Sequence, residues 1–402
     1  MSNTKSILFL FTDSYPYFTN EVYLETEIEY LANQFKKIFI FPINISTTSR
    51  KLPENVSVVN IHGSLNKSKQ KFIFKSFALF FKILSSFNSR KLISKKIKKN
   101  FLDTYNALLY NDSIEKFIKE NNINSGQVVA YSYWFLHWSY IISILKKNKL
   151  VQKAVSRTHM GDLYDDLCDH SFTEFKLNYL DNLFSISKDG KQHLKMMYPK
   201  YEHKLALSYL GVNYISKNPH SFNNKNYTIV SCSSMNKQKR IHSFFEILQN
   251  CELNINWVHF GGMKSEIEAL LPKIKELPIN IKTDFRGYTP NESILEYYQN
   301  NHIDLFLNLS LAEGIPVTIM EAISFGIPAM ATNVCGSPEI VCYDNNMILE
   351  KYFNPNSVGK LIEDFLLNDA NNDAYREKIF NFWNENFNAK KNYEEFAVLI
   401  SA

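Results

Sequence analysis

The sequence predicts an α/β protein with two doubly wound parallel sheets, and three observations lead to that class. A chain of 402 residues is long for one domain and suits two domains of about 200 residues each. Short apolar runs alternate with segments of helical spacing in both halves, as in parallel sheets covered by helices. The polar run 216–226 separates the two series and is the expected interdomain linker.

In the first half, apolar runs bounded by polar residues predict the strands, and helical spacing predicts the helices. The expected strands are 6–11, 37–42, 56–61, 127–131, 154–157 and, last in this half, 182–187. The expected helices are 21–35, a basic helical region and 111–121. Ser187 has the side chain of a helix N-cap, so a further helix is expected to follow it.

The second half repeats the alternation. The expected strands are 227–231, 257–260, 285–288, 303–308 and 327–332. Helices are expected from Ile241, from Pro316 to Gly326, over 355–367 and from Ala374 to the end of the chain. Pro316 suits a first helical turn because its missing N–H has no partner there, and Gly326 suits a helix end.

Composition narrows the class further. The apolar fraction of 45% indicates a globular protein, and no apolar run reaches the ~20 residues of a membrane-spanning helix. The five cysteines are scattered and odd in number, which predicts reduced thiols and a cytoplasmic location. The run 7–11 is too short for a secretory signal and fits a first strand better.

The segment 67–99 combines basic and aromatic residues, and no acidic residue lies between Glu54 and Asp103. Its cations are Lys67, Lys69, Lys71, Lys75, Lys82, Arg90, Lys91, Lys95, Lys96, Lys98 and Lys99. Its phenylalanines are Phe72, Phe74, Phe77, Phe80, Phe81 and Phe87. This pattern predicts peripheral contact with an anionic membrane. A solvated basic helix face and a site for another polyanion are alternatives, whereas no nucleic-acid motif accompanies the charge.

The strand 303–308, the loop 309–314 and the helix after Pro316 form one unit, with one carboxylate at the mouth of the loop and another inside the helix. Ligands of parallel sheets bind at the carboxyl ends of strands, and a helix N-terminus favours phosphate. Glu313 lies at this loop and can accept hydrogen bonds from sugar hydroxyls. Glu321 follows inside the helix, where it can reach the ribose end of an elongated ligand. Taken singly, each carboxylate also fits an ordinary solvated position.

The string Glu313-Gly-Ile-Pro-Val-Thr-Ile-Met-Glu321 resembles the E-x7-E motif of glycosyltransferase family 4. Residues 322–328 and 336–341 resemble the continuation of that motif. The resemblance implies the GT-B fold: two Rossmann-like domains facing across a cleft, with a C-terminal helix that crosses back to the first. It further implies a retaining, metal-independent transferase of nucleotide-diphosphate sugars, such as a UDP- or GDP-sugar, with no cofactor. The residues implied at the donor are Glu313, Gly314, Ile315, Pro316, Val317 and Glu321.

The basic turn 233–240 follows the first strand of the second half. Cations there suit a diphosphate leaving group, because they neutralise the charge that grows as the glycosidic bond breaks. Lys239 matches the family's lysine, and Arg240 is a second candidate. Ser234 stands where many members carry an arginine, which leaves a solvated basic turn as an alternative. Main-chain groups at Gly287 and Tyr288 are expected to contact the base, again by resemblance.

The first half is expected to bind the acceptor. The loop 12–21 holds no glycine, which argues against cradling of phosphate by its backbone and favours acceptor contact through Tyr17, Asn20 and Glu21. Residues Arg157, His159 and Asp162 resemble an R-x-H-x-x-D segment of polysaccharide-building members, in which the histidine contacts sugar. A lone buried histidine is the alternative. A D-x-D metal site is a further interpretation of the nearby aspartates Asp162, Asp165, Asp166 and Asp169. No apolar strand runs directly into them, so no metal is expected.

The expected domains are 1–213 for the acceptor, 214–376 for the nucleotide sugar, and a helix 377–402 that packs back on the first domain. The expected function is sugar transfer to a glycan or lipid-linked glycan in surface polysaccharide synthesis. The catalytic candidates are Glu313, His159 and Lys239. A catalytically silent nucleotide-sugar-binding subunit and a nucleotide-sugar epimerase or hydrolase are the alternatives.

Overall fold

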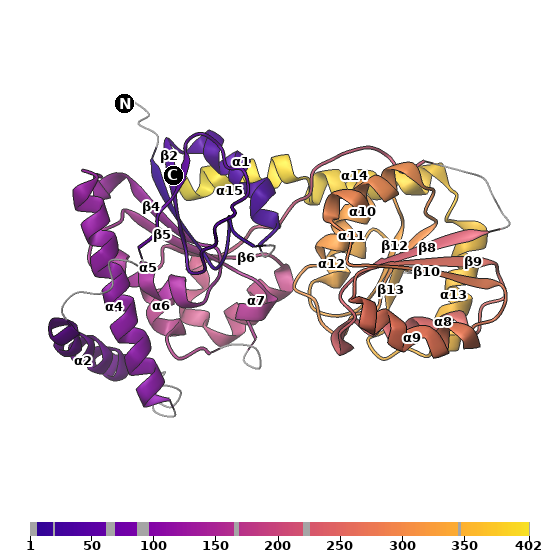
Figure 1. Ribbon diagram of the computed structural model, residues 1–402, viewed down its shortest axis with the longest axis horizontal. Helices are drawn as coiled ribbons and strands as arrows, with labels where there is room; N and C mark the ends of the chain where they lie inside the picture. The colour runs from indigo at the N-terminus through magenta and orange to yellow at the C-terminus, as the bar shows by residue number, and fades with distance from the viewer. Residues whose placement is uncertain are drawn as a thin grey trace. The chain divides into compact units, whose positions relative to one another are not determined.

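The computed structural model describes residues 6–18, 21–61, 69–86, 96–164, 169–219, 226–344 and 347–401. The chain forms two compact units, residues 1–209 with 393–402 and residues 210–392, each built around one sheet (Figure 1). The chain therefore passes from unit 1 to unit 2 after Tyr209 and returns after Asn392, whereas the predicted boundaries follow residues 213 and 376. Asn218, in the expected linker, is packed in unit 2, where it donates to the carbonyls of Tyr298 and Asn301.

Unit 1 holds a seven-stranded sheet in which every pairing is parallel. The strand order is β3 (Val56–Val58), β2 (Lys37–Pro42), β1 (Ile7–Thr12), β4 (Val128–Ser132), β5 (Lys153–Thr158), β6 (Asn182–Ser185) and β7 (Leu205–Leu207). The order reverses between β1 and β4, because the chain first adds strands on one side of β1 and then on the other. A parallel sheet with such a reversal binds ligands at the carboxyl ends of the two central strands.

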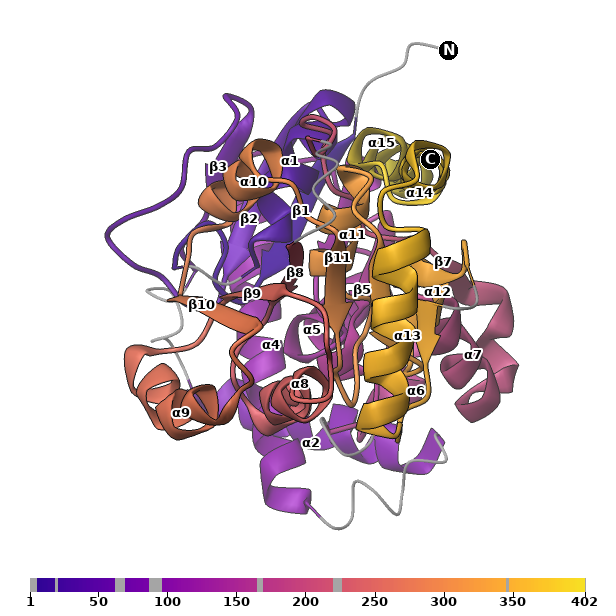
Figure 2. The same ribbon diagram turned by 90° about the vertical axis from the view of Figure 1, so that its right-hand side faces the viewer.

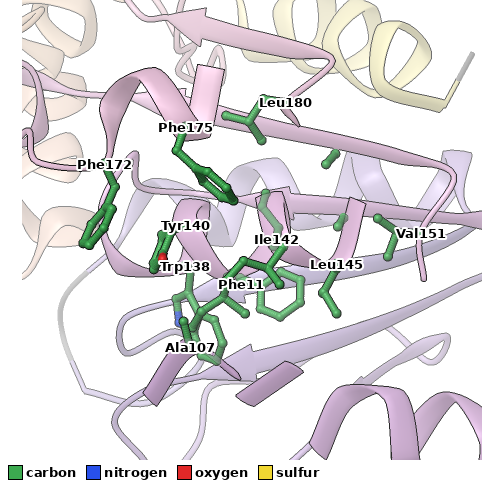
Figure 3. Close-up of a cluster of buried hydrophobic side chains, with 14 of the residues drawn as sticks. Phe11, Ala107, Trp138, Tyr140, Ile142, Leu145, Val151, Phe172, Phe175 and Leu180 are labelled. Atoms are coloured by element: carbon green, nitrogen blue, oxygen red, sulfur yellow. The ribbon is translucent and has the colours of Figure 1, made fainter. Parts of the chain in front are cut away.

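Helices cover both faces of this sheet, because parallel strands bury side chains on both sides. One face packs on α1 (Tyr23–Gln34) and α15 (Ala389–Ser401), through a buried cluster that includes Ile28 and Phe396. The other face carries α4 (Ile97–Glu120), α5 (His137–Lys147), α6 (Thr173–Tyr179) and α7 (Lys188–Met197), with α2 (Lys69–Ser86) against α4. Figure 3 shows part of this second core, where Tyr140 stacks on Phe172 at 4.3 Å between ring centroids.

The sequence did not predict α5, α6, β7 or the first half of α4. Helix α5 could have been predicted, because its apolar residues Trp138, Ile141, Ile142 and Leu145 have the spacing of one helix face. Helix α4 presents polar residues to α5: the Thr104 hydroxyl lies 3.1 Å from Tyr140 Oη, and Asn111 donates to the Ile141 carbonyl. Because polar residues occupy part of the buried face of α4, its apolar residues do not show the regular helical spacing by which a helix is predicted. Ser187, in contrast, caps α7 as predicted, accepting from Gly190 N–H at 3.0 Å.

Unit 2 holds a six-stranded parallel sheet, in the order β10 (Ile281–Gly287), β9 (Ile255–Phe260), β8 (Tyr227–Cys232), β11 (Leu305–Asn308), β12 (Ala329–Thr332) and β13 (Ile348–Leu349). Its helices are α8 (Ile241–Leu248), α9 (Lys264–Glu276), α10 (Asn291–Asn300), α11 (Val317–Ser324), α12 (Ser337–Val341), α13 (Pro355–Asn368) and α14 (Asp373–Asn386). Figure 2 gives a second view of both sheets and their helices. Here the order reverses between β8 and β11, which makes the carboxyl ends of these strands the expected ligand site.

In the part of the chain that the structure describes, no helix is long and apolar enough to cross a membrane. Four cysteines in the same ranges are free thiols: Cys232, Cys251, Cys335 and Cys342. Cys168 lies outside the described residues.

Candidate active site

The reversal point of unit 2 brings together two loops that are far apart in the sequence. Residues 233–240 follow β8, and residues 309–316 follow β11. Leu311 N–H donates to the Gln238 carbonyl at 2.8 Å, and the Gln238 side chain donates to the Ala312 carbonyl at 3.1 Å. The two loops are therefore tied to each other by main-chain and side-chain hydrogen bonds.

Glu313 lies where these loops meet. Its Oε1 accepts hydrogen bonds from Lys239 Nζ, from Ser310 Oγ at 2.7 Å and from Asn308 Nδ2 at 3.3 Å. All the hydrogen bonds that described residues make to this carboxylate end on Oε1. The side chain is almost buried, with 11% of its surface exposed. The protein thus fixes one carboxylate oxygen and leaves Oε2 able to accept from a ligand.

The cations of the basic turn have different environments. Lys239 is the last residue of a short 3-10 turn, whose start is capped by the Asn236 side chain accepting from Lys239 N–H at 3.1 Å. Arg240 has a left-handed backbone (φ 50°), and its guanidinium donates to the carbonyls of Leu309, Ser310 and Lys351. Arg240 therefore braces the loop that carries Glu313. Ser234 is exposed and accepts from the Asn236 amide.

The helix α11 begins beside Glu313. Pro316 occupies its N-cap position, and no side chain caps the helix. The free N–H groups at such a helix start, with the helix dipole, favour an anion. Ile315 and Val317 are each only 5% exposed, so they anchor the turn in the core. Gly314 joins this anchored turn to Glu313.

Glu321 occupies the second turn of α11 and is 7% exposed. Its Oε1 accepts from Asn291 Nδ2 at 2.7 Å. Asn291 lies at the start of α10, the helix that follows β10. Burial raises the pKa of Glu321 to about 7, which the Asn291 hydrogen bond partly offsets. Gly287 ends β10 with φ 66° and accepts from Gly261 N–H, and the Tyr288 side chain is 75% exposed. The residues expected at the nucleotide thus lie at one edge of the sheet.

In unit 1, the loop after β1 folds around the carboxylate of Glu21. Its Oε1 accepts from Asp13 N–H at 3.0 Å and Trp134 Nε1 at 2.7 Å, and its Oε2 accepts from Ser14 and Tyr15 N–H, both at 2.7 Å. These successive N–H groups form a nest that suits an anion, and Glu21 fills it. Burial and the Glu21 carboxylate raise the pKa of Asp13 to about 6. Glu21 therefore shapes the loop.

His159 follows β5, and its ring lies beside those of Trp134 and Tyr133. Its centroid is 4.3 Å from that of Trp134 and 4.7 Å from that of Tyr133. Neither ring nitrogen has a hydrogen-bond partner among the described residues, although the residue is only 8% exposed. Burial, and to a smaller degree Arg157, lower the pKa of His159 well below its ordinary value. The imidazole is therefore neutral at pH 7.

Asp162 is fully buried and holds the loop that carries His159. Its Oδ1 accepts from Thr158 Oγ1 and from His159 N–H, both at 2.6 Å, and its Oδ2 accepts from Phe135 N–H at 2.7 Å. Burial raises the pKa of Asp162 to about 6 even though these hydrogen bonds favour the charged form. Asp162 thus ties the loops after β4 and β5 together without facing solvent.

Arg157 has no exposed surface and forms a 2.5 Å ion pair with Glu27, which is equally buried. Its guanidinium also lies 4.0 Å from the ring centroid of Phe396 on α15. This position, between the sheet and the helices α1 and α15, offers no surface to an acceptor, and Arg157 is not among the residues that we propose to contact one. Tyr17 is partly exposed and pairs with Ser49, and Asn20 lies outside the described residues.

Sequence reasoning missed four residues of these sites: Asn308, Ser310, Asn291 and Trp134. Only their place in the chain could have identified them, because each is the last residue of a strand or follows the carboxyl end of a strand within four residues. No cluster of three His, Cys, Asp or Glu side chains that could hold a metal occurs within the described ranges. Asp169 pairs with Lys96 and Lys99, whereas Asp165 and Asp166 lie outside those ranges.

Comparison with known proteins gives a family-model match over part of the chain and a fold likeness over almost all of it. Residues 214–381 match the family model of glycosyl transferases group 1. No curated protein matches the sequence. Among solved structures, HepE of Anabaena in complex with UDP is 12% identical, with a TM-score of 0.68 over 98% of this chain and 99% of that one.

Two further solved structures resemble this chain to a similar degree. A glycosyltransferase from Rickettsia africae is 16% identical, with a TM-score of 0.68 over 98% of each chain. Sucrose-phosphate synthase from Thermosynechococcus elongatus is 12% identical, with a TM-score of 0.69 over 98% of each chain. These likenesses confirm the predicted α/β architecture and its GT-B fold.

Proposed function

Given that this chain has the GT-B fold and carries a glycosyl transferases group 1 domain over residues 214–381, we propose that it is a retaining glycosyltransferase. It would move a sugar from a UDP- or GDP-sugar to a glycan or lipid-linked glycan acceptor. One observation carries the proposal: Lys239 and Glu313 meet at the reversal point of unit 2, beside the uncapped start of α11. The cation and the helix N-terminus suit a diphosphate, and a carboxylate with one oxygen able to accept suits the hydroxyls of an attached sugar.

Each residue has a part in the proposed reaction. Lys239 and the N–H groups of α11 stabilise the departing diphosphate, whose charge grows in the transition state. Glu313 Oε2 accepts from a hydroxyl of the donor sugar and orients it, while Glu321 accepts from the ribose. The acceptor hydroxyl approaches the face that the diphosphate leaves, and a phosphate oxygen takes its proton. This scheme gives the sugar the same anomeric configuration before and after transfer, and it needs no metal.

Complexes of a structurally similar protein support a nucleotide sugar as the donor. HepE was solved with UDP, with UDP and glucose, and with UDP-glucose, in structures that match 98% of this chain. The fold likeness and the family domain favour a uridine or guanosine diphosphate sugar here as well. Surface polysaccharide or lipopolysaccharide synthesis is our proposed setting, since one matching structure is a lipopolysaccharide outer core galactosyltransferase.

We also propose peripheral contact with an anionic membrane, from the cytoplasmic side. On α2, Phe74, Phe77 and Phe81 are 78%, 46% and 60% exposed, and Lys75 and Lys82 are exposed beside them. Exposed aromatic residues between lysines, with no acidic residue on the helix, complement a surface of anionic lipids. Of the rest of the basic segment, residues 67–68 and 87–95 lie outside the described ranges.

One alternative retains support, a subunit that binds a nucleotide sugar without transferring it. Ser234 replaces a cation with a short hydroxyl, and the Arg240 guanidinium is engaged with three carbonyls. If the chain is such a subunit, Lys239 alone supplies too little positive charge to stabilise a departing diphosphate. Nucleotide binding without transfer would support it.

Thermal unfolding with a panel of nucleotides and nucleotide sugars tests the proposal, with and without EDTA. A ligand at about 100 times its dissociation constant adds roughly 2.7 kcal/mol to the stability of the folded state. We expect one UDP- or GDP-sugar to raise the transition temperature regardless of EDTA, and the same compound to serve as donor to extracted glycolipid. If no nucleotide shifts the transition, the donor site is not functional. If EDTA abolishes the shift, the metal-free reading is wrong.

A further inference from the structure

Unit 1 contains a pocket that has no part in the proposed transfer reaction. Its volume is about 370 Å³, and it lies between the first turns of α4, the start of α5 and the segment 169–172 that leads into α6. The side chains that give it its chemical character are Lys99, Asp103, His137, Tyr140, Asp169 and Phe172. The pocket therefore combines charged groups of both signs with an aromatic wall.

The lysines at this pocket carry more positive charge than their carboxylate partner neutralises. Lys96 and Lys99 both pair with Oδ2 of Asp169, at 3.2 and 2.8 Å. The other oxygen of Asp169 accepts from Ser171 N–H at 3.1 Å and from the Ser171 hydroxyl at 2.5 Å. Two cations share one carboxylate, so one positive charge is left over at this end of the pocket. A phosphate group suits such a position.

A negative charge lies one helical turn away. Asp103 follows Lys99 by four residues on α4, so the two side chains lie on the same face of the helix. Lys99 nevertheless pairs with Asp169, and no described residue hydrogen-bonds the Asp103 carboxylate. Burial raises the pKa of Asp103, and the charge of Lys99 offsets this only in part. The carboxylate is thus able to accept from an ammonium group in the pocket.

The rest of the wall is uncharged. Burial lowers the pKa of His137 to about 4, so its ring is neutral at pH 7 and can donate one hydrogen bond. Helix α5 begins at this residue and no side chain caps it, which leaves its first N–H groups for an anion. The rings of Tyr140 and Phe172 stack at 4.3 Å between centroids (Figure 3). A simple anion would meet Asp103 here and a simple cation would meet the lysines, whereas a zwitterion satisfies both.

We propose that this pocket binds phosphoethanolamine, as the headgroup of a membrane phospholipid. The phosphate oxygens would accept from Lys99, from His137 and from the first N–H groups of α5. The ammonium group would donate to Asp103, one turn along α4 from the lysine.

The location of the pocket favours a lipid as the source of this group. Phe101, two residues before Asp103, packs on Phe77 of α2 at 4.5 Å between ring centroids. Leu102, between Phe101 and Asp103, is 55% exposed. The pocket therefore lies next to the helix that we propose to contact the membrane. The lipid source rests on that proposed contact, whereas the binding of phosphoethanolamine does not.

Calorimetry with soluble headgroups tests the pocket without a membrane. We expect the wild type to bind glycerophosphoethanolamine more tightly than glycerol phosphate, because only the first has an ammonium group for Asp103. D103N should weaken glycerophosphoethanolamine binding roughly tenfold, as loss of one charged hydrogen bond implies, without weakening glycerol phosphate binding. K99M should weaken both. Asp112 is exposed on the same helix, so D112N should bind like the wild type.

Two results would overturn the proposed pocket. One is equal affinity of the wild type for the two compounds, and the other is equal weakening of both compounds in D103N, which would show a structural role for Asp103. Nucleotide-induced stabilisation, measured on the same variants, reports whether they are folded. Its absence in the wild type would instead refute the donor site of unit 2.

Vesicles distinguish a lipid from a soluble source. Phosphatidylglycerol vesicles would contain equal fractions of either phosphatidylethanolamine or phosphatidylcholine, whose quaternary ammonium cannot donate a hydrogen bond. The wild type should prefer phosphatidylethanolamine, D103N should lose this preference, and F74S/F81S should bind less to both kinds of vesicle while keeping it. Binding of the soluble headgroup without any preference among vesicles would contradict the lipid source. Unchanged vesicle binding of F74S/F81S would refute the contact through α2 and leave the pocket standing.

Discussion

The ammonium group of Lys239 donates to Oε1 of Glu313, although the two residues lie 74 positions apart in the sequence. The pair joins the basic turn after β8 to the loop after β11, so the two candidate catalytic residues position each other. A diphosphate that binds Lys239 competes with Glu313 for this cation. Ser310 and Asn308 then keep Oε1 in place, because they donate to the same oxygen.

Replacing Glu313 by alanine should lower turnover by roughly 10²–10³-fold, the usual effect of removing one group that stabilises or orients the transition state. Unfolding temperature and nucleotide affinity should change little, since the diphosphate and ribose contacts remain. Initial-rate kinetics with calorimetry of nucleotide binding measure both effects. Near-normal turnover would remove Glu313 from the mechanism.

Replacing Lys239 by methionine should reduce turnover by a similar factor, because it removes positive charge from the leaving diphosphate. Lys237 provides a matched control: it lies in the same turn and is exposed, and K237M should leave turnover within a few-fold of wild type. The double variant K239M/E313A should lose less activity than the two single losses multiplied, as expected for groups in contact. Fully multiplicative losses would show that the two residues act independently.

Glu321 should make stability and nucleotide binding depend on pH. Its pKa is about 7 when folded and 4.5 in its ordinary state, so the folded protein holds the proton more tightly. The contribution of Glu321 to stability is therefore fully present below pH 4.5 and is lost as pH rises to 7, by about 3 kcal/mol at most. Relative to E321Q, the wild type should lose stability over this range, as urea unfolding at several pH values would measure.

The same titration predicts the opposite trend for the ligand. Ribose hydroxyls donate to a carboxylate, so nucleotide affinity should rise as pH increases through 7, and this rise should be absent in E321Q. Asp13 and Asp162, with pKa values near 6, are unchanged in E321Q and cancel in the comparison. A pH-independent difference between the two proteins would contradict both trends.

Replacing Arg157 by methionine should destabilise unit 1 by about 3–5 kcal/mol, because it leaves the Glu27 carboxylate buried without a counter-ion. The double variant E27M/R157M should recover most of this loss, since two apolar side chains carry no desolvation penalty. Chemical unfolding monitored at the tryptophans of unit 1 measures both. Equal destabilisation of single and double variants would show that the packing of Arg157 against Phe396 is the dominant contribution.

Replacing Phe74 and Phe81 by serine should weaken binding to vesicles that contain anionic lipid, because each phenylalanine buries apolar area at the interface. The matched control is L367S, on α13 of unit 2, where Leu367 is 61% exposed. Vesicle sedimentation at low and at high salt would separate the apolar part from the electrostatic part. Unchanged binding of F74S/F81S would refute the proposed contact through α2.

The sequence predicted the strand, loop and helix around Glu313 because the pattern that specifies them is local. Residues 313–321 lie in one strand-loop-helix unit, and spacing alone sets Glu313 before α11 and Glu321 inside it. The partners of these carboxylates were not predictable in the same way. Asn291 reaches Glu321 from the loop after β10, and Ser310 bonds Glu313 through a turn whose shape depends on Arg240.

Arg157 shows the opposite case. Its position two residues before His159 in the sequence predicted contact with the acceptor, but the structure buries its side chain completely, in an ion pair with Glu27 on α1. The ion pair with Glu27 on α1 and the contact with Phe396 on α15 join residues far apart in the chain, so neither leaves a trace in the local sequence. Trp134 escaped notice for the same reason, since its partners are residues 21 and 159.

The return of residues 393–402 to unit 1 has a consequence for synthesis of the chain. The buried cluster between α1 and the sheet, to which Phe396 and Ile400 belong, is incomplete until residues 393–402 leave the ribosome. At roughly 5–20 residues per second, translation of 210–392 takes tens of seconds. During that interval unit 2 can fold alone, whereas unit 1 waits with part of its interior open to water and to chaperones.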